Sequence, residues 1–339
     1  MDFDINDEQR NFAEHSREFF AAHAGTESAR TLLDNPGEAV PGRKVLAELG
    51  FSSLTIPEEA GGIGAELLNM ALVAEQAGRY LAGPSLATAA RIAVLLEGDI
   101  ERLTAISEGT LAVAVLDGSP AGTAASMDVV GATHFLALDG NNLVIGEGSV
   151  TPGEAIDATR GIGHVDLTSQ EIIRTDIRGR WDRAKHVACV VLAAEDLGAA
   201  DRVVELGVEH AKDRHAFGRE IGGFQAVKHR LVDDWVAVNQ LRSLIWWAAW
   251  TADNAPDQLP VAASAAKAYS SNIFQTACET LIHVLGAVGF TWEHDAHLYW
   301  RRAKVDRLLL GDESEHLAEV ALRSIAAQSR IHEPESASA

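Results

Sequence analysis

The sequence is poor in cysteine, in basic residues and in long apolar runs, and each shortage argues against a class of protein. Its two cysteines, Cys189 and Cys278, lie far apart in apolar surroundings, which excludes a disulfide framework and predicts reduced, buried thiols in a cytoplasmic protein. Lysine and arginine number 28 against 49 acidic residues, and a net charge of -21 disfavours binding to nucleic acid or anionic membranes. No uninterrupted apolar run reaches the roughly 18 residues of a membrane span, and no basic segment followed by an apolar one opens the chain. We therefore expect neither export nor membrane insertion.

Metal and dinucleotide motifs are also missing. His294 and His297 lack the i, i+4 spacing and the third ligand of a zinc site, so no metal is expected. The glycines of Glu58-Glu-Ala-Gly-Gly-Ile-Gly64 do not lie between a strand and a helix, as the dinucleotide-binding fingerprint requires.

The spacing of apolar residues divides the chain into parts. Helical spacing fills the first hundred residues and begins at Asn6, a residue that can cap a helix running to about residue 24. Short β-type runs separated by turn signals follow, and helical spacing returns near Trp181. By pattern alone this is an α+β chain with a helical C-terminal half. The β-type runs cover 111–116, 134–138, 143–145 and 172–173, and the expected units are 1–108 (helical), 109–182 (small β domain), 183–330 (helical) and 331–339 (polar, disordered tail).

One loop combines residues that suit phosphate binding. It contains Arg214, Phe217 and Gly218 and joins two long amphipathic helices within 193–250. An arginine can place its planar fork on two phosphate oxygens, and glycine lets the backbone approach a ligand closely. Alternatively, Arg214 pairs with Asp213 or Glu220 and Phe217 belongs to the core. The residues alone leave both interpretations open.

Three ordered stretches indicate a family. The segment Asp213-Arg-His-Ala-Phe-Gly-Arg-Glu-Ile-Gly-Gly-Phe-Gln225 resembles the R-x-x-F-G…Q loop of acyl-CoA dehydrogenases. Ile56-Pro-Glu-Glu-Ala-Gly-Gly-Ile-Gly64 resembles their PEE-x-GG-x-G turn. The stretch His283–Glu293, with Arg302-Ala-Lys, resembles their Q-x-x-GG and RDAK stretches. The resemblance implies a mainly α fold with an N-terminal helical domain, a shortened middle β domain and a C-terminal four-helix bundle that packs as a tetramer.

The family's catalytic base is missing at both of its known positions. Members of the family remove a proton from the α-carbon of an acyl-CoA thioester with a glutamate, while FAD takes a hydride from the β-carbon. The corresponding positions are Leu310 and Ala188 here, and neither side chain can accept a proton. Asp312 and Glu195 are fallback bases. For Asp312 the alternative is a capping box with Glu315, and for Glu195 it is a place at a helix interface.

The flavin contacts implied by the resemblance are split. The family's two ring-bracketing motifs in the middle domain have no clear counterpart in Asp117-Gly-Ser-Pro-Ala-Gly-Thr123 or in the stretch before Trp181. The positions that hold the FAD of the adjacent subunit are retained, with His283 for a glutamine and Ala287 for a glycine. They are Arg214, Phe217, Phe224, Gln225, His283, Gly286 and Ala287.

This combination resembles the short, base-lacking subunits of actinobacterial α2β2 acyl-CoA dehydrogenases of sterol catabolism. It implies an oxidoreductase active only as a heterotetramer with a catalytic subunit, sharing FAD at the interface and acting on an acyl-CoA, with a steroid-derived one as a candidate. Two alternatives stay open. One is a structural or regulatory relic that binds no flavin, and the other is an active homo-oligomer that uses Asp312 or Glu195 as its base.

Overall fold

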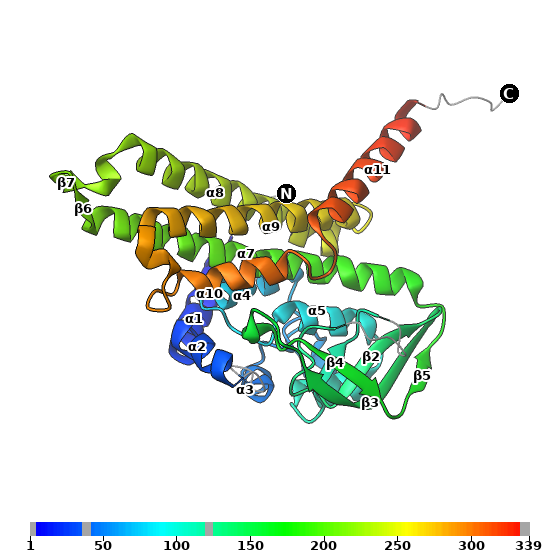
Figure 1. The fold of residues 1–339 in the computed structure, drawn as a ribbon. Coiled ribbons are helices and arrows are strands. Elements are labelled where there is room, and N and C mark those ends of the chain that lie inside the picture. Colours follow the sequence, from blue (N-terminus) through cyan, green and yellow to red (C-terminus); the bar gives the residue numbers. More distant parts are fainter. Residues whose placement is uncertain (1–4, 36–41, 119–124, 333–339) are drawn as a thin grey trace.

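The structure, a computed structural model, describes residues 5–35, 42–118 and 125–332 (Figure 1). Its N-terminal part is helical, as predicted, and Asn6 caps the first helix. The Asn6 side chain accepts the backbone N–H of Gln9 at 2.8 Å, and the Gln9 side chain accepts that of Asn6 at 3.0 Å. The helices are α1 (Asp7–His23), α2 (Thr26–Asp34), α3 (Arg43–Glu48), α4 (Leu67–Arg79), α5 (Leu86–Leu95) and α6 (Ile100–Ser107), with a 3-10 turn η1 (Glu58–Ala60) before α4.

A small sheet follows and covers the four predicted β-type runs. Its order is β1-β2-β3-β4, with β5 also paired to β3, and every pairing is antiparallel except that of β1 with β2. Strand β4 was not predicted, because its run is short and Val165 is its only large buried side chain. The strands are β1 (Val113–Val115), β2 (His134–Asp139), β3 (Asn142–Pro152), β4 (Gly163–Leu167) and β5 (Glu171–Arg174), and a 3-10 turn η2 (Ala158–Arg160) precedes β4.

The C-terminal part is a helical bundle organised around its first helix. Helix α7 contacts α4 and α5 of the N-terminal part and α8 and α9 of the bundle (Figure 1). Helix α11 ends at His332 and so includes the first two residues of the predicted tail, whose remaining residues lie outside the described part of the chain. The bundle contains α7 (Arg178–Asp213), α8 (Gln225–Asn254), α9 (Leu259–Leu285), α10 (Ala296–Asp306) and α11 (Glu313–His332), with short elements β6 (His215–Ala216), β7 (Arg219–Glu220), η3 (Ile221–Gly223) and η4 (Gly286–Phe290).

Helices α4 and α7 cross in backbone contact. A Cβ atom on Gly78 would lie 1.8 Å from the carbonyl oxygen of Glu195, and one on Gly198 would lie 1.7 Å from that of Glu75. Only glycine fits at these two positions, because any side chain would overlap the facing backbone. The glycine pair therefore fixes how closely the N-terminal helices approach the bundle.

Hydropathy alone gives a misleading result for α9. The segment Leu259–Phe290 is long and apolar enough to cross a membrane, with a mean hydropathy of 1.4. No membrane span was predicted here, because polar residues interrupt its apolar residues. Half of the segment's apolar window is buried inside the protein, and α9 packs against α7, α8, α10 and α11. Its apolar composition is explained by its place in the bundle core.

Candidate functional site

The loop between α7 and α8 forms a tight hairpin at one end of the bundle (Figure 1). We call residues 214–224 the bundle-end loop. Phe217 and Gly218 stand at its turn with φ of 54° and 82°, between the paired residues Ala216 and Arg219. Two central residues with positive φ are typical of a type I′ turn, in which glycine is common and a bulky aromatic is rare. The turn holds the Phe217 ring 96% exposed, which is unusual for an apolar side chain and points to a role outside the core.

Aromatic and cationic groups gather on this loop. The rings of Phe217 and Phe224 lie edge to face with centroids 6.2 Å apart, and the Arg219 guanidinium lies 4.0 Å from the centroid of Phe224. Arg219 was missed by the sequence reasoning, although its place beside Gly218 could have drawn attention to it. Among the described residues no carboxylate, including the predicted partners Asp213 and Glu220, forms an ion pair with Arg214, and the arginine is exposed. The alternative interpretation, in which Arg214 is paired and Phe217 is in the core, is wrong on both counts.

The predicted residues on α9 and η4 lie at the same end of the bundle. An apolar cluster of Ala211, Leu231 and Val284, with Ile221 packed against it, joins the ends of α7, α8 and α9. Gln225 begins α8, while Gly286, with φ of 66°, ends α9. Gly286 is exposed there, and so are two further predicted residues, His283 and Ala287. The fold thus brings the two predicted segments to one exposed surface. Three large apolar side chains that sequence reasoning missed are also exposed near η4, namely Val288, Phe290 and Trp292.

Neither of the two positions at which the resemblance leads us to expect the base, Ala188 and Leu310, holds an ionisable group. Ala188 is fully buried in α7, in the bundle core. Leu310 is 6% exposed, has a φ of 62° and accepts a hydrogen bond through its carbonyl from His316 Nε2 at 3.2 Å. Asp312 is exposed and accepts the backbone N–H of Glu315 at 2.9 Å, which confirms that it caps α11.

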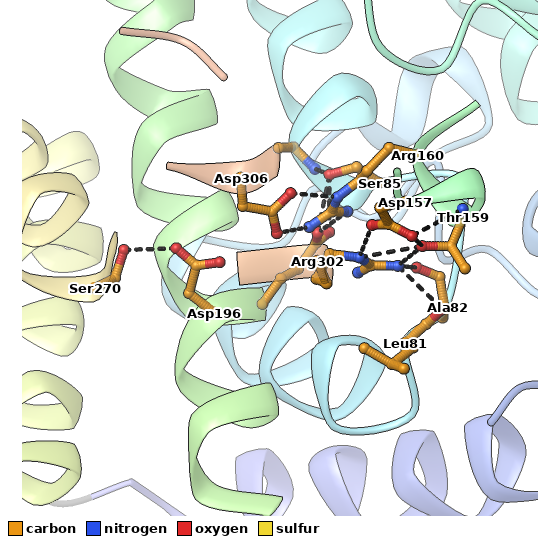
Figure 2. A network of polar contacts seen from close by, with 12 residues as sticks. Leu81, Ala82, Ser85, Asp157, Thr159, Arg160, Asp196, Ser270, Arg302 and Asp306 are labelled. Atoms are coloured by element: carbon orange, nitrogen blue, oxygen red, sulfur yellow. Dashed lines mark hydrogen bonds and ion pairs between the residues drawn. The ribbon is translucent and has the colours of Figure 1, made fainter. Parts of the chain in front are cut away.

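Glu195 lies inside a buried network of charges, and Figure 2 shows the arginines and aspartates of that network. It is 2% exposed, and its Oε1 accepts the backbone N–H of Leu86 at 2.8 Å and the Ser85 hydroxyl at 2.9 Å. Its Oε2 lies 2.5 Å from Arg160 Nη1. Burial raises the pKa of Glu195, and the charge of Arg160 opposes that shift. The carboxylate is therefore committed to structural partners and has little access to solvent.

Two arginines extend the network to α10, to the stretch around η2 and to the segment between α4 and α5. Arg160 Nε donates to Asp306 at 2.7 Å, and a second bond joins Arg160 Nη2 to the same carboxylate. Arg302 Nε donates to Asp157 at 2.6 Å, and its Nη2 reaches the carbonyls of Leu81 and Ala82, each at 3.1 Å. Burial would raise the pKa of Asp306, but Arg160 and Arg302 hold it below its ordinary value. We call Asp157, Arg160, Glu195, Asp196, Arg302 and Asp306 the buried charge network.

Residues 119–123, where the resemblance leads us to expect the first ring-bracketing motif, lie outside the described residues. Asp117, just before them, forms an ion pair with Arg91 at 2.5 Å. No group of three or more metal-binding side chains exists within 5–35, 42–118 and 125–332.

Comparison with known proteins identifies the family. The models for the acyl-CoA dehydrogenase N-terminal and C-terminal domains match residues 6–101 and 186–327. Acyl-CoA dehydrogenase IpdE2 of Mycobacterium tuberculosis is 33% identical over 311 residues, which cover 90% of this chain and 93% of that protein.

Two solved structures share the fold. A chain of the Tcur3481-Tcur3483 steroid acyl-CoA dehydrogenase superposes with a TM-score of 0.83 at 23% identity, covering 95% of this chain and 99% of that one. A chain of the ChsE4-ChsE5 complex from Mycobacterium tuberculosis superposes with a TM-score of 0.80 at 22% identity, covering 96% and 99%. By sequence and by fold, this chain belongs to the acyl-CoA dehydrogenase family.

Proposed function

We propose that this chain is a subunit of an FAD-dependent acyl-CoA dehydrogenase that depends on a partner subunit for its catalytic base. The proposal rests on one observation. Both positions at which the family places its base carry apolar side chains here, Ala188 and Leu310. The contacts of Glu195 argue against a role as the base, because Arg160, Ser85 and Leu86 engage its two oxygens in the protein interior. Asp312 is occupied in capping α11.

The bundle-end loop fits the role of completing the partner's flavin site. The exposed Arg214 offers a planar pair of donors to the pyrophosphate of FAD, and Phe217 offers an exposed aromatic face. Gln225, His283, Gly286 and Ala287 lie at the same end and would add polar contacts and room for close approach. When bound, FAD accepts the hydride from the acyl group. The residues of this chain would bind and orient the cofactor from across the interface.

Assembly with a partner is supported by the surface and by a structural neighbour. Exposed apolar side chains at the bundle end, including Phe217, Phe290 and Trp292, suit contact with another chain. The ChsE4-ChsE5 structure is a complex of two differently named chains, and the Tcur3481-Tcur3483 protein is a steroid acyl-CoA dehydrogenase. We therefore propose an α2β2 assembly in the cytoplasm that acts on a steroid-derived acyl-CoA.

The proposal is tested by measuring the affinity of the assembled enzyme for FAD after the substitution Arg214→Ala. Losing a charge-assisted bidentate contact costs about 2–3 kcal/mol, which is roughly a 30- to 150-fold weaker affinity for FAD. Arg214→Lys should recover only part of it, since an ammonium lacks the planar fork. The matched control is Arg230→Ala, an exposed arginine on α8. The measurement is the FAD dissociation constant of the chain co-purified with an acyl-CoA dehydrogenase that carries the glutamate.

Two results would contradict this proposal. Unchanged FAD affinity in Arg214→Ala would mean that the bundle-end loop does not contact the cofactor. Turnover of acyl-CoA by the chain purified alone would mean that it carries its own base. Loss of that turnover in Asp312→Asn would then identify the base as Asp312.

A further inference from the structure

A cavity of about 190 Å³ lies between the N-terminal helices and the start of the sheet. It shares no lining residue with the bundle-end loop or with the base positions. Its walls come from α3, from the beginning of α5, from the end of α6 and from the residues that lead into β1. Most of the wall is apolar, and its large side chains are Leu46, Leu86, Ile92, Ile106, Leu111 and Val113.

Two polar residues of this wall have buried atoms without partners. The Nε and Nη2 atoms of Arg43 and the hydroxyl of Ser52 are buried and bond to none of the described residues. The remaining guanidinium nitrogen, Nη1, donates to the carbonyl of Val113 at 3.2 Å. That bond anchors the group, and its Nε–Nη2 edge has no partner within 5–35, 42–118 and 125–332. Buried donors are nearly always paired in folded proteins, so this edge indicates a missing acceptor.

The charge of Arg43 is also incompletely balanced. In the described part of the chain, Asp128 is the carboxylate that acts on it, yet the Asp128 oxygens accept hydrogen bonds from the backbone N–H of Ser85, at 3.0 Å, and from the hydroxyl of Thr88. Burial lowers the pKa of Arg43, and the charge of Asp128 offsets only part of that shift. A second anion beside the guanidinium would supply both the charge and the acceptors that the cavity lacks.

We propose that this cavity binds a small monocarboxylate with an apolar body. Nε and Nη2 are two nearly parallel donors on one edge of the guanidinium, a geometry that matches the two oxygens of a carboxylate. The body would lie against Ile92, Ile106 and Leu111. The cavity equals about six times the volume of one water in the liquid, which suits a short acid of about five to seven carbons. A compact anion without an apolar body would satisfy the arginine but leave the apolar wall unused.

The experiment compares four probes on the full chain by calorimetry and thermal melting. Hexanoate should bind saturably and raise the melting temperature. Acetate should bind at least roughly tenfold more weakly because it lacks the apolar body. Hexanamide should fail because it carries no charge, and inorganic phosphate should bind no better than acetate. Equal binding of hexanoate and acetate, or of hexanoate and hexanamide, would overturn the proposal.

Three variants locate the site. Arg43→Gln should weaken hexanoate binding by roughly 30-fold or more, since it removes the charge and the paired donors. Ala89→Leu places a larger side chain in the same cavity and should block binding while leaving Arg43 intact. Arg230→Gln, on the exposed face of α8, should bind as the wild type does.

Ala89→Leu with the affinity of the wild type would refute the site even if Arg43→Gln failed to fold. The cavity and the bundle-end loop share no residue. The measurement of FAD affinity therefore tests the proposed function separately from the proposed carboxylate site.

Discussion

Glu195→Gln distinguishes a structural carboxylate from a catalytic one. Glutamine keeps an oxygen for the Leu86 N–H and the Ser85 hydroxyl but removes the charge that faces Arg160 Nη1 at 2.5 Å. Breaking a buried ion pair costs about 3–5 kcal/mol. Because Arg160 retains Asp306, we expect a loss near 3 kcal/mol in the free energy of unfolding. With an unfolding entropy of about 2.1 cal/mol/K per residue, a chain of 339 residues would lose about 4 °C in melting temperature.

The control lies on the same helix. Glu209→Gln changes an exposed glutamate that pairs with Arg202 at 3.3 Å, and it should alter stability by less than about 0.5 kcal/mol. Both variants are followed by urea unfolding with circular dichroism and by acyl-CoA turnover of the assembled enzyme. We expect Glu195→Gln to lose stability and keep turnover at temperatures where it is folded. Wild-type stability together with a thousandfold loss of turnover would show that Glu195 is the base and that our structural assignment is mistaken.

Two further predictions concern the interior. Gly198→Ala places a Cβ 1.7 Å from the Glu75 carbonyl oxygen, so we expect the free energy of unfolding to fall by about 3 kcal/mol or more, as measured by thermal melting. The control is Gly179→Ala on the same helix, where nothing lies within 4 Å of the added Cβ. It should leave stability unchanged or raise it by up to about 1 kcal/mol. Burial, reinforced by the charge of Asp306, raises the pKa of Asp196 well above its ordinary 3.8, so the stability it contributes is present at low pH and is lost as pH rises through the raised pKa. Asp196→Asn keeps a polar partner for Ser270 but cannot ionise. We expect the stability of this variant, relative to that of the wild type, to rise as pH increases. If the unfolding free energies of the two proteins change in parallel between about pH 5 and about pH 8, the assignment is contradicted.

Most of the fold could be predicted from local signals in the sequence. The capping residue Asn6, the apolar spacing of α7 and α8 and the turn residues between β strands each act over a few positions, so the sequence displays them directly. The bundle-end loop was also predictable, because its arginine, aromatic ring and glycine follow one another. The positive φ of Phe217 was not, since a phenylalanine gives no local reason to adopt it.

The buried charge network could not be read from the sequence in the same way. Arg160 meets Glu195 across 35 positions and Asp306 across 146. Asp157 and Arg160 precede β4 in a turn-rich stretch, where charged residues ordinarily face solvent. The nearest available signal was on α10, where Arg302 and Asp306 are four residues apart on one helix face. That spacing also describes an exposed ion pair, so burial had to come from the structure.

The arginines of this network bear on how the chain loses its fold. Arg302, from α10, bonds the carbonyls of Leu81 and Ala82 between α4 and α5, while Arg160, beside the sheet, bonds carboxylates on α7 and α10. Opening the N-terminal helices would remove two carbonyl acceptors from the buried Arg302 guanidinium, and detaching the sheet would leave Glu195 and Asp306 without Arg160 inside the bundle. We therefore expect the N-terminal helices, the sheet and the bundle to unfold as one cooperative unit, because separating them exposes charges that they neutralise for one another.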